Sequence, residues 1–191
     1  METKIEQAAT GEELYRRFHM GDTDAFGCLV ALYEDELFNF INGITNDYYE
    51  AKQLTIEAFA RLAVSAGQFA GKSSLKTYLF TIGKNLALRH VKKRSREQHI
   101  SYEEIIEVLK SEDETPYEFM EREENQRLLH EAIRCLKDDH RVVLILLYFE
   151  DMSYIQAGQV MEKSERQIKA LAYRAKAALK KKLESEGFSL V

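Results

Sequence analysis

The sequence predicts an all-α protein, with two helical domains joined by a flexible acidic linker. Apolar residues recur at the three- and four-residue spacing of helices, and the alternation typical of strands is scarce. Helix breakers are rare, with one proline and nine glycines in 191 residues. Residues 97–126 hold that proline, Pro116, and carry eleven acidic against two basic side chains, a net charge of −9. We therefore expect domains over residues 1–96 and 127–191, with residues 97–126 as the linker.

Four helices are expected in the first domain. Their predicted ranges are 12–19, 22–45, 49–66 and 73–96. Asp22 follows a glycine and offers an N-cap for the second helix, and Asn46–Asp47 ends it. A loop punctuated by Gly67 and Gly71 precedes the fourth helix, for which Ser73 or Ser74 is the expected N-cap.

Four further helices are expected in the second domain. Their predicted ranges are 125–135, 138–150, 153–161 and 164–184. Asp138–Asp139 is the expected cap of the second of these. The last two are joined by a break at Glu162–Lys163 and predict a helix–turn–helix, a common device for reading duplex DNA in the major groove. Gly158 lacks a side chain, which permits the two helices to approach closely where they cross.

The helix over residues 164–184 combines an apolar stripe with a basic face. Arg, Lys and Gln are the side chains that bond base edges and phosphates, and alanine or an aromatic ring can contact a thymine methyl. An ordinary amphipathic helix with a solvated basic face is the alternative. The candidate DNA-binding residues are Ser164, Arg166, Gln167, Lys169, Ala170, Tyr173, Arg174 and Lys176.

A second basic zone lies between residues 68 and 96. Residues 89–96 carry five basic and no acidic side chains, more than the capping of a helix C-terminus needs. Basic residues can follow a nucleic-acid backbone, while neighbouring aromatic rings hold an unstacked base. Phe69 and Tyr78 could instead belong to the core. The candidate DNA-binding residues are Phe69, Gly71, Lys72, Ser73, Ser74, Lys76, Thr77, Lys84, Asn85, Arg89, Lys92 and Lys93.

The remaining composition excludes several classes of protein. The net charge of −5 does not argue against DNA binding, because local charge governs phosphate attraction within a Debye length of ~8 Å. Cys28 and Cys135 lie far apart in apolar runs, and we expect them to be buried free thiols in a cytoplasmic protein. No phosphate-cradling loop, metal-ligand spacing or nucleophile elbow is present. We therefore expect no enzymatic activity, no cofactor, no metal and no small-molecule substrate.

Two ordered blocks resemble the sigma-70 family of bacterial transcription factors. The block that resembles the second conserved region comprises Phe59–Leu62, Phe69 and Ser74–Leu88, followed by a basic tail. The block that resembles the fourth region comprises Leu136, Leu144–Tyr154 and Ile168–Leu179. With only two regions and a short linker, the chain resembles the compact extracytoplasmic-function (ECF) class.

The resemblance implies a sigma factor that binds core RNA polymerase, at its clamp and flap, and directs it to promoter DNA. The helix matching residues 50–61 would dock on the clamp. The loop matching residues 69–74 would capture a base flipped from the −10 element, and the last helix would read the −35 element. The implied polymerase-binding residues are Glu50, Gln53, Leu54, Ile56, Glu57 and Phe59. A stand-alone helix–turn–helix regulator is the alternative.

The resemblance also implies an anti-sigma factor as a partner. Its candidate surfaces are the docking face of residues 50–61 and the linker residues Ile105, Ile106 and Leu109. The chain departs from the family pattern where Lys52, Gln53 and Ile56 replace two acids and a glutamine, which makes the docking face less acidic and more apolar. A second departure is Glu162, which stands at the usual glycine of the helix–turn–helix, so that the turn must avoid positive φ or accept strain.

Overall fold

The computed structural model describes residues 9–65, 69, 71–97 and 128–185, and the regular elements in this part of the chain are all helices. The all-α prediction is therefore confirmed. Residues 128–134 are also helical. The other helices are α1 (Gly11–His19), α2 (Thr23–Thr45), α3 (Tyr48–Val64), α4 (Leu75–Glu97), α6 (Asp138–Tyr148), α7 (Tyr154–Met161) and α8 (Glu165–Ser185). Except for Glu97 at the end of α4, the predicted linker lies outside the described residues, as do Ile105, Ile106 and Leu109.

Local side-chain caps explain where most helices begin. The Asp22 carboxylate accepts a 3.2 Å hydrogen bond from the amide of Ala25, and Ser74 Oγ accepts one of 3.1 Å from the amide of Thr77. Both of these predicted caps are confirmed. The predicted cap at Asp138–Asp139 is wrong, because Lys137 takes the N-cap position of α6 without a side-chain hydrogen bond. The two aspartates lie in the first turn, where negative charge still favours the helix N-terminus.

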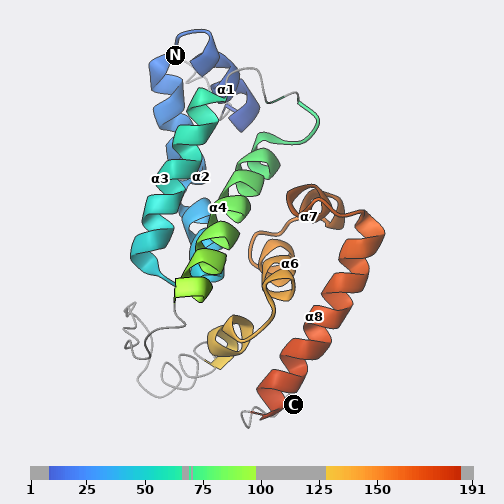
Figure 1. The fold of residues 1–191 in the computed structure, drawn as a ribbon. Helices are drawn as coiled ribbons and strands as arrows, with labels where there is room; N and C mark the ends of the chain where they lie inside the picture. Colours follow the sequence, from blue (N-terminus) through green and yellow to red (C-terminus); the bar gives the residue numbers. More distant parts are fainter. Residues whose placement is uncertain (1–8, 66–68, 70, 98–127, 186–191) are drawn as a thin grey trace, which may run out of the picture.

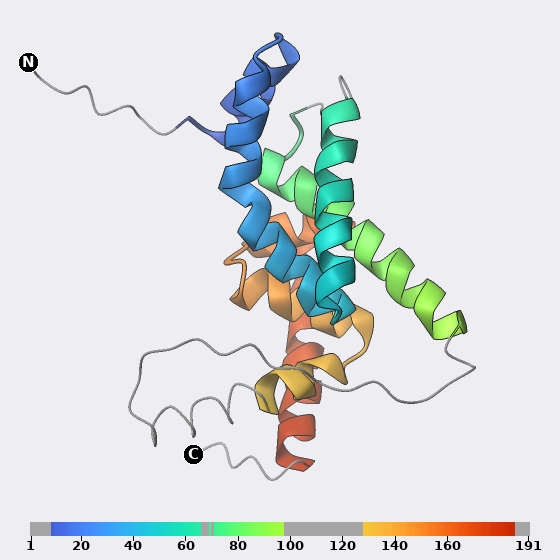
Figure 2. The same cartoon turned by 90° about the vertical axis from the view of Figure 1, so that its left-hand side faces the viewer.

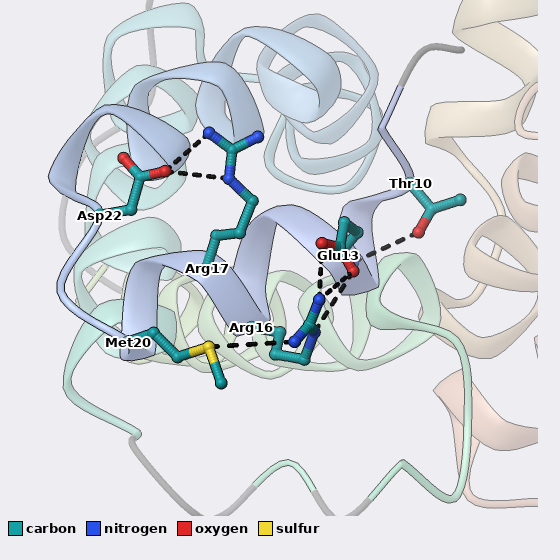
Figure 3. A network of polar contacts seen from close by, with 6 residues as sticks. All are labelled: Thr10, Glu13, Arg16, Arg17, Met20 and Asp22. Carbon is teal, nitrogen blue, oxygen red and sulfur yellow. Dashed lines mark hydrogen bonds and ion pairs between the residues drawn. The ribbon is translucent and has the colours of Figure 1, made fainter.

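Asp22 also fixes the corner between α1 and α2 (Figure 3). Its Oδ2 accepts hydrogen bonds of 2.9 and 2.7 Å from the Arg17 guanidinium, while Oδ1 caps α2. The hydrogen bond from Arg17 lowers the pKa of the Asp22 carboxyl. Within α1 itself, Glu13 pairs with Arg16 at 2.7 Å. One carboxylate thus joins the end of α1 to the start of α2 and sets the direction in which α2 leaves the corner.

The N-terminal helices pack around a shared apolar core. Helices α2, α3 and α4 lie side by side, and α1 covers the end at which α2 begins (Figure 1). The rings of Phe40 and Phe80 join α2 to α4, with centroids 4.9 Å apart. Further side chains with no exposed surface complete this core, namely Leu29, Leu37, Ile41, Ile44, Leu62, Leu75 and Leu79. Apolar burial, which is non-directional, therefore holds this group together.

The C-terminal helices form a helix–turn–helix supported by α6. Helix α6 packs against both α7 and α8 and lies between α4 and α8 (Figure 1). A Cβ added to Gly158 would lie 2.6 Å from the carbonyl oxygen of Lys163, so only glycine allows the turn to approach α7 this closely. The prediction for Gly158 is confirmed. A capping box between Ser153 and Gln156 starts α7.

The two groups of helices also pack against each other, through α2 with α6 and α4 with α7 (Figure 1, Figure 2). Their buried residues form one continuous apolar cluster. A Cβ added to Gly43 on α2 would lie 2.8 Å from Cδ1 of Ile145 on α6. The division into two domains therefore stays a prediction. The expectation of buried thiols is wrong, because Cys28 and Cys135 are both free and exposed.

Candidate nucleic-acid interface

The polar and basic face of α8 that carries the predicted DNA-binding residues, here called the recognition face, is exposed. Ile168, Leu171, Ala172 and Ala175 are buried against α6 and α7, as the helical period of the sequence predicts. The opposite face is left to solvent. All eight candidate residues predicted on this helix are exposed: Ser164, Arg166, Gln167, Lys169, Ala170, Tyr173, Arg174 and Lys176. The helix therefore presents a continuous polar and basic surface that a DNA groove could receive.

Two residues at the start of this face cap the helix. The amide of Gln167 donates a 3.3 Å hydrogen bond to Ser164 Oγ, and Gln167 Oε1 accepts one of 2.8 Å from the amide of Ser164. This reciprocal pair is a capping box. Because the side chain of Gln167 is engaged with Ser164, it reaches DNA only by exchanging that hydrogen bond. The side chain of Tyr173 is 77% exposed and projects from the middle of the same face.

Two lysines of the recognition face lie over aromatic rings. Lys169 Nζ is 5.6 Å from the ring centroid of Tyr154 and 2.6 Å from the Glu165 carboxylate. Lys176 Nζ lies 4.7 Å from the ring centroid of Tyr148. The hydrogen bond to Glu165 raises the pKa of Lys169, so this lysine stays positively charged. Cation–π contacts thus orient two charges on α8 without removing them from the surface.

The basic zone between residues 68 and 96 is divided between an exposed and a buried part. Gly71, Lys72, Asn85, Arg89, Lys92 and Lys93 are exposed, and Phe69, Ser73, Ser74 and Lys76 are half-buried. The ring of Phe69 packs against Tyr15 and Tyr78, with centroids 5.7 and 5.4 Å apart. Thr77 and Lys84 are buried, so the free chain in this form does not offer their side chains to DNA, contrary to the expectation. Thr77 hydrogen-bonds with Ser74, and Lys84 contacts α7.

The predicted polymerase-binding residues also divide into an exposed and a buried part. Gln53, Ile56 and Glu57 are exposed on α3, and Glu50 is half-buried, with its carboxylate 3.4 Å from Nδ1 of His90. Leu54 and Phe59 belong to the core, at 8% and 5% exposure, which corrects the expectation that they form part of a docking face.

Sequence reasoning missed two exposed apolar residues on α3. Tyr49 and Val64 are 81% and 82% exposed. Residues 49, 53, 56, 60 and 64 recur at intervals of four, three, four and four, which places them on one face of the helix. The same helical spacing could have identified this α3 stripe (Tyr49, Gln53, Ile56, Ala60 and Val64) in the sequence. Large exposed apolar side chains gathered on one helix are typical of a protein-binding surface.

Sequence reasoning also missed Glu150, which lies two residues after the end of α6. Burial raises the pKa of its carboxyl to about 7, partly offset by the positive charge of Lys76 and reinforced by Glu36 and Asp151. Lys76 pairs with Glu36 across α4 and α2 at 2.9 Å. A carboxyl from the C-terminal helices is thus placed among charges of the N-terminal helices, which no local pattern could reveal.

The described residues contain no group of three or more His, Cys, Asp or Glu side chains arranged to hold a metal ion. In that same part of the chain, no helix combines the length and apolar character needed to span a membrane.

Both groups of helices match family models of known proteins. Residues 29–97 match the family model described as Sigma-70 region 2, and residues 126–179 match that of Sigma-70, region 4. The chain is 30% identical over 181 residues to the RNA polymerase sigma-H factor of Pseudomonas aeruginosa, covering 91% of this chain and 93% of that protein. It is 24% identical to the ECF RNA polymerase sigma factor SigW of Bacillus subtilis, covering 85% and 91%.

Solved structures show a similar fold. CnrH, in complex with the cytosolic domain of CnrY, is similar with a TM-score of 0.67 and 20% identity, over 90% of this chain and 96% of CnrH. The sigma factor RpoE of Bartonella quintana, in complex with the anti-sigma factor NepR, is similar with a TM-score of 0.65 and 21% identity, over 81% and 94%. With two region matches in the expected order and a relative aligned over nearly its whole length, the chain belongs to the sigma-70 family of RNA polymerase sigma factors, in the ECF class.

Proposed function

We propose that this sigma factor contacts a promoter at two places and core polymerase at a third. The exposed face of α8 receives the −35 duplex. The loop from Phe69 to Ser74 and the exposed basic residues of α4 receive the −10 element and the fork upstream of it. The α3 stripe docks on the clamp of the polymerase. The protein works in the cytoplasm, where it supplies recognition and strand capture while the polymerase performs the catalysis.

The full exposure of the α8 recognition face is the observation that carries this proposal. All eight predicted residues are exposed, while the apolar stripe on the opposite side is buried. Side chains of this kind distinguish base pairs in the major groove, and the surrounding positive charges draw the helix to phosphate. The proposal also requires that both DNA contacts fall on one promoter. Family membership supports this, because region 2 and region 4 of a sigma factor act on one promoter through the polymerase.

In vitro transcription tests the proposal most directly. The purified chain is added to bacterial core polymerase on a genomic library, and transcript start sites are mapped. We expect initiation from a small set of promoters that share two sequence elements, and no such initiation from core polymerase alone. Tight duplex binding by the chain alone, without engagement of polymerase, would instead identify a stand-alone helix–turn–helix regulator.

The α3 stripe is also the surface on which we place an anti-sigma partner. CnrH and the Bartonella quintana RpoE were both solved with a bound partner, which for RpoE is the anti-sigma factor NepR. In this chain the exposed apolar residues Tyr49, Ile56 and Val64 offer such a partner a surface that polymerase also needs. An Ile56→Asp variant should lose capture of an inhibitor from native cells while keeping its thermal stability. Unchanged capture would place the inhibitor elsewhere.

A further inference from the structure

Lys84 on α4 is a buried ammonium at the contact between the two groups of helices. Its side chain is only 8% exposed. Nζ donates a 2.8 Å hydrogen bond to the carbonyl oxygen of Val160 and lies 3.5 Å from Oε1 of Glu162. Both partners belong to the helix–turn–helix, 76 residues or more along the chain. A buried charge is tolerated only where such partners compensate its lost hydration.

The carbonyl of Val160 is a suitable acceptor because α7 ends one residue later, at Met161. The last carbonyls of a helix have no intrahelical partner and carry the negative end of its dipole. The neighbouring carbonyls of Gly158 and Gln159 already accept hydrogen bonds from the amides of Lys163 and Glu162. Lys84 therefore completes the end of α7 from outside the helix–turn–helix.

The contact with Lys84 explains why Glu162 keeps a strained backbone conformation, an outcome that the sequence left open. This glutamate adopts the left-handed region, with φ 56° and ψ 41°, which disfavours side chains other than glycine. The family pattern has glycine at this position. A glycine would remove the strain, but it would also remove the carboxylate that faces Lys84. The strained glutamate thus has a role that the unstrained residue could not fill.

Other contacts support the same closed arrangement. Arg141 Nη1 on α6 donates a 2.8 Å hydrogen bond to the carbonyl of Ile44 on α2. Gln159 Nε2 donates one of 3.4 Å to the carbonyl of Lys72, in the loop before α4. Ile145 covers Gly43 nearby. The two groups therefore meet through both apolar and polar contacts at α2 and α6, and through polar contacts between α7 and α4 with the loop before it.

We propose that Lys84 and Glu162 form an intramolecular latch that closes the free chain on itself. Lys84 is one of the residues expected to contact the −10 element, and its ammonium cannot serve DNA and the end of α7 together. The closed form and the promoter-bound form therefore exclude each other, and polymerase or DNA must compete for the open form. The biological meaning of the latch rests on the proposed function, but the closed state can be measured without DNA or polymerase.

The two native cysteines provide the measurement. Cys28 on α2 and Cys135 just before α6 are exposed, are the only cysteines of the chain, and lie in different groups of helices. Nitroxide labels on the two cysteines report the distance between them in the free full-length protein, measured by pulsed electron–electron double resonance. We expect one narrow distance distribution for the unsubstituted protein. In Glu162→Gly, a second, longer component should grow at least several-fold, although the turn itself is relieved of strain.

Two further variants sharpen the test. Lys84→Met keeps the length of the stem and removes the charge, so it should open the chain at least as far as Glu162→Gly. Glu184→Gln is the matched control, because Glu184 pairs with Lys180 inside α8 and should leave the distance unchanged. Circular dichroism checks that each variant keeps its helices. A single narrow distribution that persists in both latch variants, or a broad distribution already present without substitution, would overturn the latch.

A binding measurement separates the latch from the proposed function. The same proteins are titrated with a single-stranded oligonucleotide from a −10 element mapped by transcription. Glu162→Gly should bind several-fold more tightly than the unsubstituted protein, because Lys84 is released. If the distances change as expected but no form binds promoter DNA, the latch stands and the proposed −10 contact fails.

Discussion

Arg141 reaches from α6 to the last turn of α2, where its guanidinium donates a 2.8 Å hydrogen bond to the carbonyl of Ile44. The same side chain donates to the carbonyls of Arg134 and Leu136, at 2.7 and 3.1 Å. Its Nε is buried and has no partner among the described residues. Burial lowers the pKa of Arg141, although the group remains charged at neutral pH. One planar fork therefore joins the end of α2 to the stretch of backbone just before α6.

Replacing Arg141 should destabilise the fold. Arg141→Met leaves three carbonyls without this donor, and we expect a loss of about 2–4 kcal/mol in the free energy of unfolding, measured by urea denaturation. Arg141→Lys should give an intermediate loss, because a single ammonium cannot reproduce the fork. Arg166→Met on the exposed face of α8 is the control and should stay within about 0.5 kcal/mol. Equal stability of Arg141→Met and the control would contradict this assignment.

Glu150 should make stability depend on pH between about 4.5 and 7. Its pKa in the folded chain is raised to about 7, so the folded state binds more protons than the unfolded state in that window. Stability contributed at this site is therefore greatest at low pH and falls as pH rises towards 7. Glu150→Gln should remove this slope and stabilise the chain at pH 8 by on the order of 2 kcal/mol, since water still reaches part of the carboxyl.

Urea denaturation at several pH values checks the Glu150 prediction. The informative quantity is the difference between the variant and the unsubstituted protein, because other groups titrate in both. Glu34→Gln, at an exposed position on α2, should leave the pH dependence as it was. Parallel pH curves for Glu150→Gln and the unsubstituted protein would show that this carboxyl does not titrate as proposed.

Tyr173 and Arg174 should affect promoter use and not folding. Tyr173 is 77% exposed, and the Nε of Arg174 donates a 3.3 Å hydrogen bond to the carbonyl of Ala170 within its own helix. Because a good base contact is worth about 1–3 kcal/mol, either alanine substitution should reduce transcription from a −35-dependent promoter by roughly 10-fold. Thermal unfolding should be unchanged. Lys181→Ala, further along α8, is the control, and an equal loss there would point to a general charge effect.

Substitutions at Ile56 and Leu54, both on α3, should separate the effect on polymerase docking from the effect on folding. Ile56 is 56% exposed, and Leu54 is 8% exposed. Ile56→Asp should weaken co-purification with core polymerase at unchanged thermal stability. Leu54→Ala should cost about 2–5 kcal/mol of stability because it leaves a cavity in the core. Met20→Asp, at an exposed apolar residue outside α3, controls for an added surface charge, and polymerase binding that survives Ile56→Asp would remove the α3 stripe from the docking surface.

Features that depend on neighbouring residues could be predicted from the sequence. The helices begin and end within a few residues of their expected positions, because apolar period and capping are local properties. The buried stripe of α8 follows from the same period, and so does the exposure of its recognition face. Lys137 is the exception among the caps, since a residue without a capping side chain leaves no signal.

Features that depend on distant partners were decided by the tertiary structure alone. Thr77 and Lys84 belong to a helix that was expected, yet their burial depends on which helices pack against them. The exposure of Cys28 and Cys135 has the same cause. The left-handed conformation of Glu162 was one of two outcomes open from the sequence, and its contact with Lys84 requires α7 to lie on α4. Sequence thus determined the helices and their chemistry, whereas packing between residues far apart in the chain decided which side chains remain free to act.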